Sequence, residues 1–172
     1  MLLPLDDEPM VHRAVRRALD AGLAPVVVVL GHEPERIREA LADLDCFFVT
    51  SDDANGPTSA SLHAGLRALG PTVSAAVVML ADMVHVSEAM IRALMDASAQ
   101  GDAPLEVSRY GEVFAPPLLF RRALWPELFV WTGEGCGKAV VIAHRAEAGI
   151  HDWPADALKD IDTPSDYDAL PR

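Results

Sequence analysis

The sequence predicts an α/β fold of the Rossmann-like type, with three layers and a mixed, mostly parallel sheet. Runs of β-branched residues alternate with amphipathic helical segments, which is typical of consecutive βαβ units. The chain has 172 residues, of which 51% are apolar and 6% are aromatic. This length and composition suit one compact domain over residues 1–172, and no internal repeat or linker divides it.

The first predicted helix covers residues 9–21. Its apolar positions recur at helical spacing, and its other side carries Arg13, Arg16 and Arg17. Gly22 follows as a helix stop. Because a doubly wound fold normally opens with a strand that leads into the first helix, we expect the first strand to be missing from this chain.

The strongest strand signal lies at residues 25–30. Every position there is apolar and most are β-branched, which predicts a strand buried on both faces at the centre of the sheet. An amphipathic helix at residues 37–44 and a strand at 46–50 complete a βαβ unit. A third helix at residues 62–69 and a third buried strand at 75–80 continue the alternation.

The pattern changes in the second half of the chain. Ser87 is expected to cap a fourth helix. Two extended runs at residues 104–110 and 113–120, joined by Gly111, predict an antiparallel hairpin, so the sheet should be mixed. The remaining segments are expected to be a short helix, a glycine-rich turn, a second helix and a strand, at residues 121–128, 133–137, 138–145 and 149–153.

Charge and cysteine content exclude several partners. Twenty-six acidic and fourteen basic residues give a net charge of −12 at pH 7, which disfavours nucleic acid. Cys46 and Cys136 form no Cys-x-x-Cys pair, so neither a disulfide framework nor a zinc site is indicated. The longest apolar run, residues 25–30, is too short to cross a membrane, and residues 1–5 are too short for a signal peptide core. We expect a cytoplasmic protein without nucleic-acid or membrane partners.

Asp82 is the sharpest candidate for chemistry. Ligands of open α/β sheets bind beyond the carboxyl ends of the strands, and Asp82 follows the predicted strand at residues 75–80. A carboxylate held there suits a hard cation such as Mg²⁺. The alternative is an aspartate that only caps the following turn.

A second pair of carboxylates lies near the end of the sequence. Asp160 and Asp162 are two residues apart, so in an extended segment they would project to the same side and could complete a metal site with Asp82. The alternative is an Asx-turn before Thr163, which would cap a last helical turn.

Polar residues follow two other predicted strands. Asn55 and Gly56, with Ser59 and Ser61 at a helix start, could bind a base or ribose through side chains and backbone N–H groups, or they could simply cap that helix. His32 follows the strand at 25–30, where a lone histidine is more often a turn residue than a catalyst.

The glycine-rich turn at residues 133–138 enters a helix and could contact phosphate. It lacks the spacing of a Walker loop or of a dinucleotide-binding fingerprint. Cys136 within it has no histidine or asparagine partner indicated by the sequence, so it is not expected to be a nucleophile.

Five segments resemble one known family. Their sequences are LLPLDDEPMV at 2–11, AGLAPVVVVLGH at 21–32, NGPTSASLHAGL at 55–66, VMLADMV at 78–84 and DIDTPSDY at 160–167. In this order they resemble the MobA-like nucleotidyltransferase family, in particular the cytidylyltransferases of molybdenum cofactor maturation. The last segment is the most specific match, because it is similar to the family's DIDTPEDY.

The resemblance implies a nucleotidyltransferase fold and a Mg²⁺-dependent reaction. A nucleotidyl group would pass from a nucleoside triphosphate, CTP by this likeness, to a phosphorylated acceptor such as molybdopterin. The family's magnesium-binding aspartate corresponds to Asp82, and Asp162 is expected to share the ion, with Asp160 in reserve. Asn55, Gly56, Ser59, Ser61 and His32 are then the substrate-binding candidates.

The chain also departs from the family pattern. Members open with a strand and a glycine-rich loop whose arginine and lysine offset phosphate charge, and Met1 stands about where that lysine would be. Two functions therefore stay open: an enzyme, or a non-catalytic relative that acts as a binding or regulatory module. We expect the 172-residue chain to bind nucleotide weakly, and an upstream extension with the loop, if the reading frame encodes one, to be active.

Overall fold

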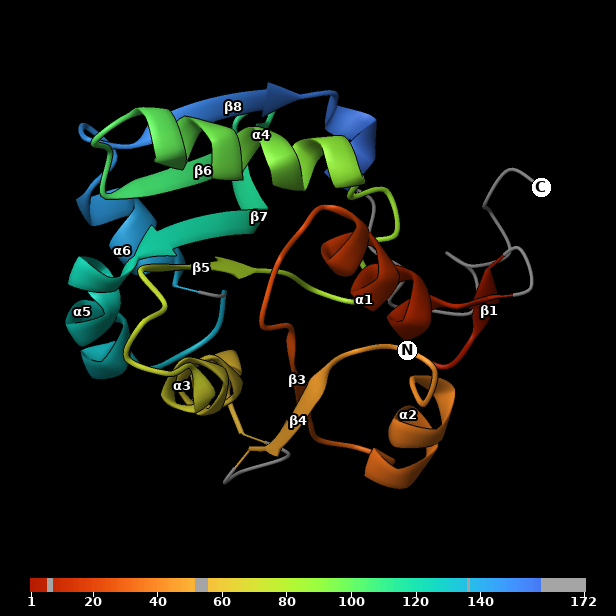
Figure 1. Ribbon diagram of the computed structural model, residues 1–172. Helices are drawn as coiled ribbons and strands as arrows, with labels where there is room; N and C mark the ends of the chain where they lie inside the picture. The colour runs from red at the N-terminus through yellow and green to blue at the C-terminus, as the bar shows by residue number, and fades with distance from the viewer. Residues whose placement is uncertain (6–7, 52–55, 136, 159–172) are drawn as a thin grey trace.

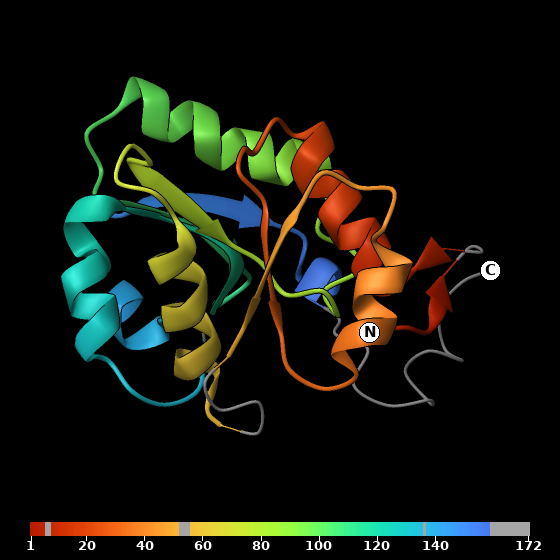
Figure 2. The same ribbon diagram turned by 60° about the horizontal axis from the view of Figure 1, so that its bottom comes forward.

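The computed structural model describes residues 1–5, 8–51, 56–135 and 137–158. Its helices lie on both sides of a central layer of strands, which gives three layers (Figures 1 and 2). The helices are α1 (Met10–Asp20), α2 (Pro34–Ala40), α3 (Thr58–Ala68), α4 (Glu88–Gln100), α5 (Trp125–Val130) and α6 (Lys138–Ala143), with short 3₁₀ turns at Arg122–Leu124 and Ala155–Leu158. No helix in these ranges is long and apolar enough to span a membrane.

The strands fall into three hydrogen-bonded groups. They are β1 (Pro4–Leu5), β2 (Glu8–Pro9), β3 (Val27–Leu30), β4 (Phe47–Thr50), β5 (Ala75–Val78), β6 (Leu105–Tyr110), β7 (Val113–Arg121) and β8 (Gly149–Trp153). A four-stranded sheet has the order β5-β7-β6-β8, while β3 pairs with β4 and β1 pairs with β2. Pairs β3–β4 and β6–β8 are parallel, whereas β5–β7 and β6–β7 are antiparallel. The mixed α/β architecture that the sequence predicts is confirmed.

The place of β3 differs from the prediction. The sequence predicts a central strand at residues 25–30, but within the described ranges β3 pairs only with β4, and β5 pairs only with β7. Val27–Val29 and all of β5 are accordingly half-buried. The composition of β3 and β5 suits burial on both faces. In the described ranges, however, each of them has a neighbouring strand on one side only.

Ahead of α1 the described chain forms only the short β1–β2 hairpin, which joins neither larger sheet. The carbonyls of Met1 and Leu3 accept hydrogen bonds from the N–H groups of Val11 and Met10, at 3.1 Å each. The start of α1 therefore has its first donors satisfied by the residues that precede it.

The core lies on both faces of the four-stranded sheet. On one face Leu105 and Val107 of β6 pack with Leu66 of α3 and with α5 and α6. On the other face Tyr110 packs with Ile91 of α4. The alternation of β6 side chains thus divides the core into two layers. Helices α1 and α3 also reach β3, so they span the gap between β3–β4 and the larger sheet (Figure 2).

Candidate functional site

The candidate residues within the described ranges lie in the loops after β3 and β5 and at or just before the start of α3. Because β3 and β4 are parallel, their carboxyl ends share one edge, where His32 and Gly56 are found. Strand β5 ends at Val78 rather than at residue 80 as predicted. Asp82 therefore lies four residues beyond the strand, in a turn, and not directly at the strand end.

Asp82 is held in the loop between β5 and α4. The residue is half-buried, and its Oδ1 atom is shielded from solvent. Its backbone carbonyl accepts a hydrogen bond from the N–H of Val84 at 2.9 Å, which closes a tight turn. Ala81, just before it, packs in a cluster with Val11 of α1 and Val28 of β3. The loop that carries the Asp82 carboxylate is thus held by packing against α1 and β3.

Arginine side chains from α1 line the same loop. Arg13 and Arg17 border a small cavity between α1 and residues 79–86. The Arg17 guanidinium donates hydrogen bonds to the carbonyl oxygens of Val84 and Val86. Burial lowers the pKa of Arg17, and the neighbouring Arg13 and Arg16 lower it further. The local sequence pattern places these arginines only on the polar side of the helix and carries no signal for this contact with a distant loop.

His32 makes no comparable contact. Its side chain is 90% exposed, and its Nε2 atom lies 4.0 Å from a carboxylate oxygen of Glu33. Glu33 has a left-handed backbone with φ of 51° just ahead of α2. This geometry matches the turn position that the sequence favours for a lone histidine.

The start of α3 is occupied by the glycine-rich turn. The buried Ser59 hydroxyl accepts a hydrogen bond from the Gly133 N–H at 3.0 Å, and the Ser59 N–H donates to the Gly133 carbonyl at 3.0 Å. The Thr58 hydroxyl and N–H both donate to the Glu134 carboxylate. These bonds, the hydroxyl first, hold the pKa of Glu134 below its ordinary value. The Ser59 hydroxyl therefore bonds to the glycine-rich turn and not to an N–H of its own helix, which has no side-chain cap. Gly56 and Ser61 are half-buried nearby.

Three predicted site residues lie outside the described ranges. They are Asn55, Asp160 and Asp162, and Cys136 is also outside them. The expectation that Asp82 and Asp162 lie together therefore stays a prediction. Within the described ranges no three His, Cys, Asp or Glu side chains gather to hold a metal ion. Mg²⁺ needs only one or two protein carboxylates beside substrate phosphates, so a carboxylate at Asp82 suits that ion in type.

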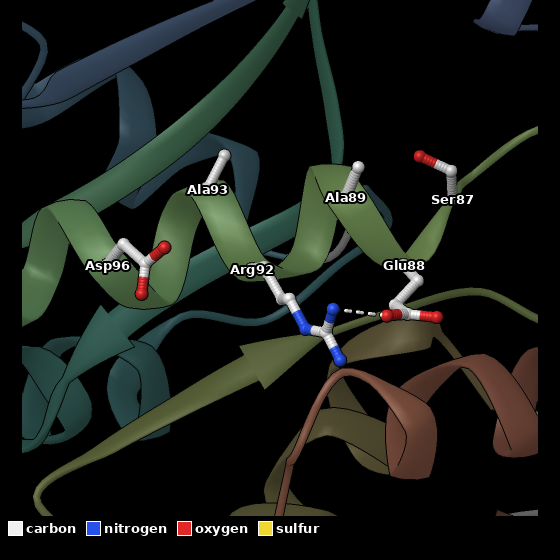
Figure 3. Close-up of a pocket in the computed structure, with 6 residues that line it drawn as sticks. All are labelled: Ser87, Glu88, Ala89, Arg92, Ala93 and Asp96. Atoms are coloured by element: carbon white, nitrogen blue, oxygen red, sulfur yellow. Dashed lines mark ion pairs between the residues drawn. The ribbon is translucent and has the colours of Figure 1, made fainter.

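A shallow depression lies on the outer face of α4, apart from the predicted residues (Figure 3). Its lining consists of Ser87, Glu88, Ala89, Arg92, Ala93 and Asp96. Arg92 forms an ion pair with Glu88 at 2.5 Å and donates to the carbonyl of Asp20 at the end of α1. These contacts join α4 to α1 and bring no candidate catalytic group into the depression.

A family model and two curated relatives match this chain. The family model for the MobA-like NTP transferase domain matches residues 1–148. The chain is 35% identical over 103 residues to the bifunctional protein GlmU of Kineococcus radiotolerans, which covers 59% of this chain and 21% of that protein. The chain thus spans about one fifth of the length of the curated relatives it matches.

Solved structures share the fold over almost the whole chain. Rv0371c of Mycobacterium tuberculosis superposes with a TM-score of 0.85 and 25% identity, over 97% of this chain and 85% of that one. A manganese complex of that protein gives a TM-score of 0.81 at 24% identity, over 97% and 88% of the two chains. A nucleotidyl transferase of Methanothermobacter gives 0.81 at 25% identity, over 96% and 80%. With the family model matching 148 of 172 residues, the chain belongs to the MobA-like NTP transferase family.

Proposed function

We propose that residues 1–172 act as one nucleotidyltransferase domain that is dependent on Mg²⁺. Its reaction is the transfer of a nucleotidyl group from a nucleoside triphosphate, CTP first among the candidates, to a phosphorylated acceptor such as molybdopterin. The observation that carries this proposal is the half-buried Asp82 in a loop beyond β5, within the segment that the family model matches. The manganese complex of Rv0371c supports a divalent ion in this fold.

The chemistry of such a site is mainly positioning. When bound, Mg²⁺ would supply positive charge that offsets the negative charge developing on the phosphates during displacement. Asp82 would hold the ion together with Asp162, and the loop from residue 79 to 86 orients the Asp82 carboxylate. The remaining candidates would orient base and ribose: His32 after β3, and Asn55, Gly56, Ser59 and Ser61 before and within the first turn of α3. Little acid–base chemistry is required, which suits a set of carboxylates and backbone amides.

One observation favours the non-catalytic alternative. The first N–H groups of α1 and of α3 already have protein acceptors, from Met1 and Leu3 in α1 and from Glu134 in α3. Ser87 likewise accepts from the Met90 N–H at the start of α4. These three helix starts therefore offer few free donors to a triphosphate. If the chain is a binding or regulatory module, it should bind nucleotide without transferring a nucleotidyl group.

The test compares wild type with Asp82→Asn and Asp96→Asn. Calorimetry with CTP, GTP and ATP in the presence of Mg²⁺ measures binding, and pyrophosphate release with molybdopterin measures transfer. We expect Asp82→Asn to lower kcat/KM by about 100-fold or more, since one charge-stabilising group is typically worth that much. Asp96 lies exposed on the outer face of α4, so Asp96→Asn should leave both values unchanged.

The outcomes separate the two functions. Equal transfer by wild type and Asp82→Asn would contradict the proposal. Nucleotide binding without transfer would support the module instead. A fusion that places the opening strand and glycine-rich loop of a relative before Met1 shows whether those parts raise nucleotide affinity and turnover on this scaffold.

A further inference from the structure

The side chain of Arg17 connects α1 to the loop that carries Asp82. Arg17 lies one turn before the end of α1 and reaches across to residues 79–86. One guanidinium nitrogen, Nη1, donates to the carbonyl oxygen of Val84 at 2.6 Å and to that of Val86 at 2.7 Å. Both acceptors lie within four residues of Asp82 on its carboxyl side.

These two carbonyls belong to buried residues. Val84 and Val86 are 6% and 3% exposed, and Val84 packs against Met10 of α1. A carbonyl in such surroundings needs a donor, because an unsatisfied buried acceptor is costly. The loop satisfies its own N–H groups at Val84 and Val86 through the turn carbonyls of Asp82 and Met83. Arg17 supplies the donor for the two carbonyls that point the other way.

We propose that Arg17 is a positioning residue that fixes the conformation of the loop at residues 82–86 and thereby sets the affinity of Asp82 for a divalent cation. The inference rests on the proposed function only in assigning the cation to Asp82. The hydrogen bonds of Arg17 go to backbone carbonyls of this loop. The effect of Arg17 passes through the two carbonyls, which fix the turn that begins at Asp82 and so the direction of its carboxylate.

The chemistry of the side chain explains why an arginine serves here. A guanidinium stays protonated even where burial and neighbouring cations lower its pKa. Its planar, fixed array of donors also loses less freedom per hydrogen bond than a lysine ammonium does. Arg17→Lys keeps the charge but lacks this planar array. It should therefore hold the two carbonyls less well than wild type and better than a variant without a charged side chain.

The experiment compares Arg17→Met, Arg17→Lys and Arg92→Met in the full chain. Arg92 is a chemically matched control, because its guanidinium also donates to a backbone carbonyl, that of Asp20 at the end of α1. Its ion pair is with Glu88 in α4 (Figure 3). Electron paramagnetic resonance measures the dissociation constant for Mn²⁺ without any turnover. Hydrogen exchange measures the opening of the amides of Val84 and Val86, with Ile91 in α4 as an internal reference.

We expect Arg17→Met to weaken Mn²⁺ binding by about 10- to 100-fold, which is the usual effect of losing a group that orients a metal ligand. Exchange at Val84 and Val86 should rise by about tenfold or more relative to Ile91, with an intermediate rise in Arg17→Lys and none in Arg92→Met. A merely structural role would lower the melting temperature of both methionine variants without this local signature.

Three results would overturn the inference, and they are distinguishable. If wild type binds Mn²⁺ through Asp82, so that Asp82→Asn loses the ion, but Arg17→Met binds it unchanged, the positioning role is wrong and the proposed function stands. If wild type and Asp82→Asn show the same Mn²⁺ binding, the metal assignment falls and the inference falls with it. Unchanged exchange at Val84 and Val86 in Arg17→Met also overturns it.

Discussion

Replacement of Ser59 by alanine tests whether this residue serves the fold or a substrate. The Ser59 hydroxyl accepts the Gly133 N–H at 3.0 Å, and its side chain is buried. Ser59→Ala removes that acceptor and leaves the Gly133 N–H without it, which should cost about 1–2 kcal/mol. For a domain of this size, each kcal/mol lowers the melting temperature by about 2–4 °C, so a fall of about 2–8 °C is expected.

Urea unfolding followed by tryptophan fluorescence measures the change. Trp131 is two residues from Gly133 and reports on the turn. Ser61→Ala is the matched control, because Ser61 is half-buried in the same helix and its hydroxyl makes no hydrogen bond in the part of the chain that the structure describes. We expect Ser61→Ala to stay within about 0.5 kcal/mol of wild type.

The opposite pattern would refute this reasoning. If Ser59→Ala unfolds at the same urea concentration as Ser61→Ala but loses nucleotide affinity, then Ser59 contacts substrate and its bond to Gly133 contributes little. The hydrogen bond from the Ser59 N–H to the Gly133 carbonyl remains in both variants. The glycine-rich turn should therefore stay beside α3 in both, and the comparison reports on the hydroxyl alone.

Two further predictions concern charge and close packing. Hydrogen bonds from Arg16 lower the pKa of Glu8 from 4.5 to about 2, so Glu8→Gln should destabilise the protein by about 1 kcal/mol at pH 7. Because the folded pKa is the lower one, this difference should shrink as the pH falls from 4.5 towards 2, and urea midpoints that differ equally at all pH values would contradict it. A Cβ at Gly149 would clash with the buried Glu106 carboxylate, so Gly149→Ala should cost about 2–3 kcal/mol by calorimetry. Gly70→Ala, with no atom within 4 Å of the new Cβ, is the control, and equal melting temperatures would contradict the clash.

Local patterns in the sequence predicted most elements well. The helix expected at 9–21 is α1, the strand expected at 149–153 is β8, and the extended runs at 104–110 and 113–120 form the β6–β7 hairpin. Each of these depends on hydropathy period and turn residues within about ten positions of each other, which a single sequence displays directly.

The pairing of the strands was harder to predict from the sequence. The apolar run at 25–30 predicted a central strand, yet β3 has only β4 as a described partner. The β1–β2 hairpin was not predicted, because two strands of two residues each carry no measurable period. Which strands become neighbours depends on contacts between distant segments, and composition reports burial preference without naming the partner.

The candidate site divides in the same way. The sequence by itself determined that the chain is an α/β protein with Asp82 in a loop after a buried-type strand, because short-range periodicity and position in the βαβ order suffice for that. Only the tertiary structure decided that Ser59 is bonded to Gly133, 74 residues away, and that Arg17 holds the carbonyls of Val84 and Val86. A polar side chain on a helix can face water or a distant backbone with the same local pattern, and the choice is made when the helices pack and bury carbonyls that need donors.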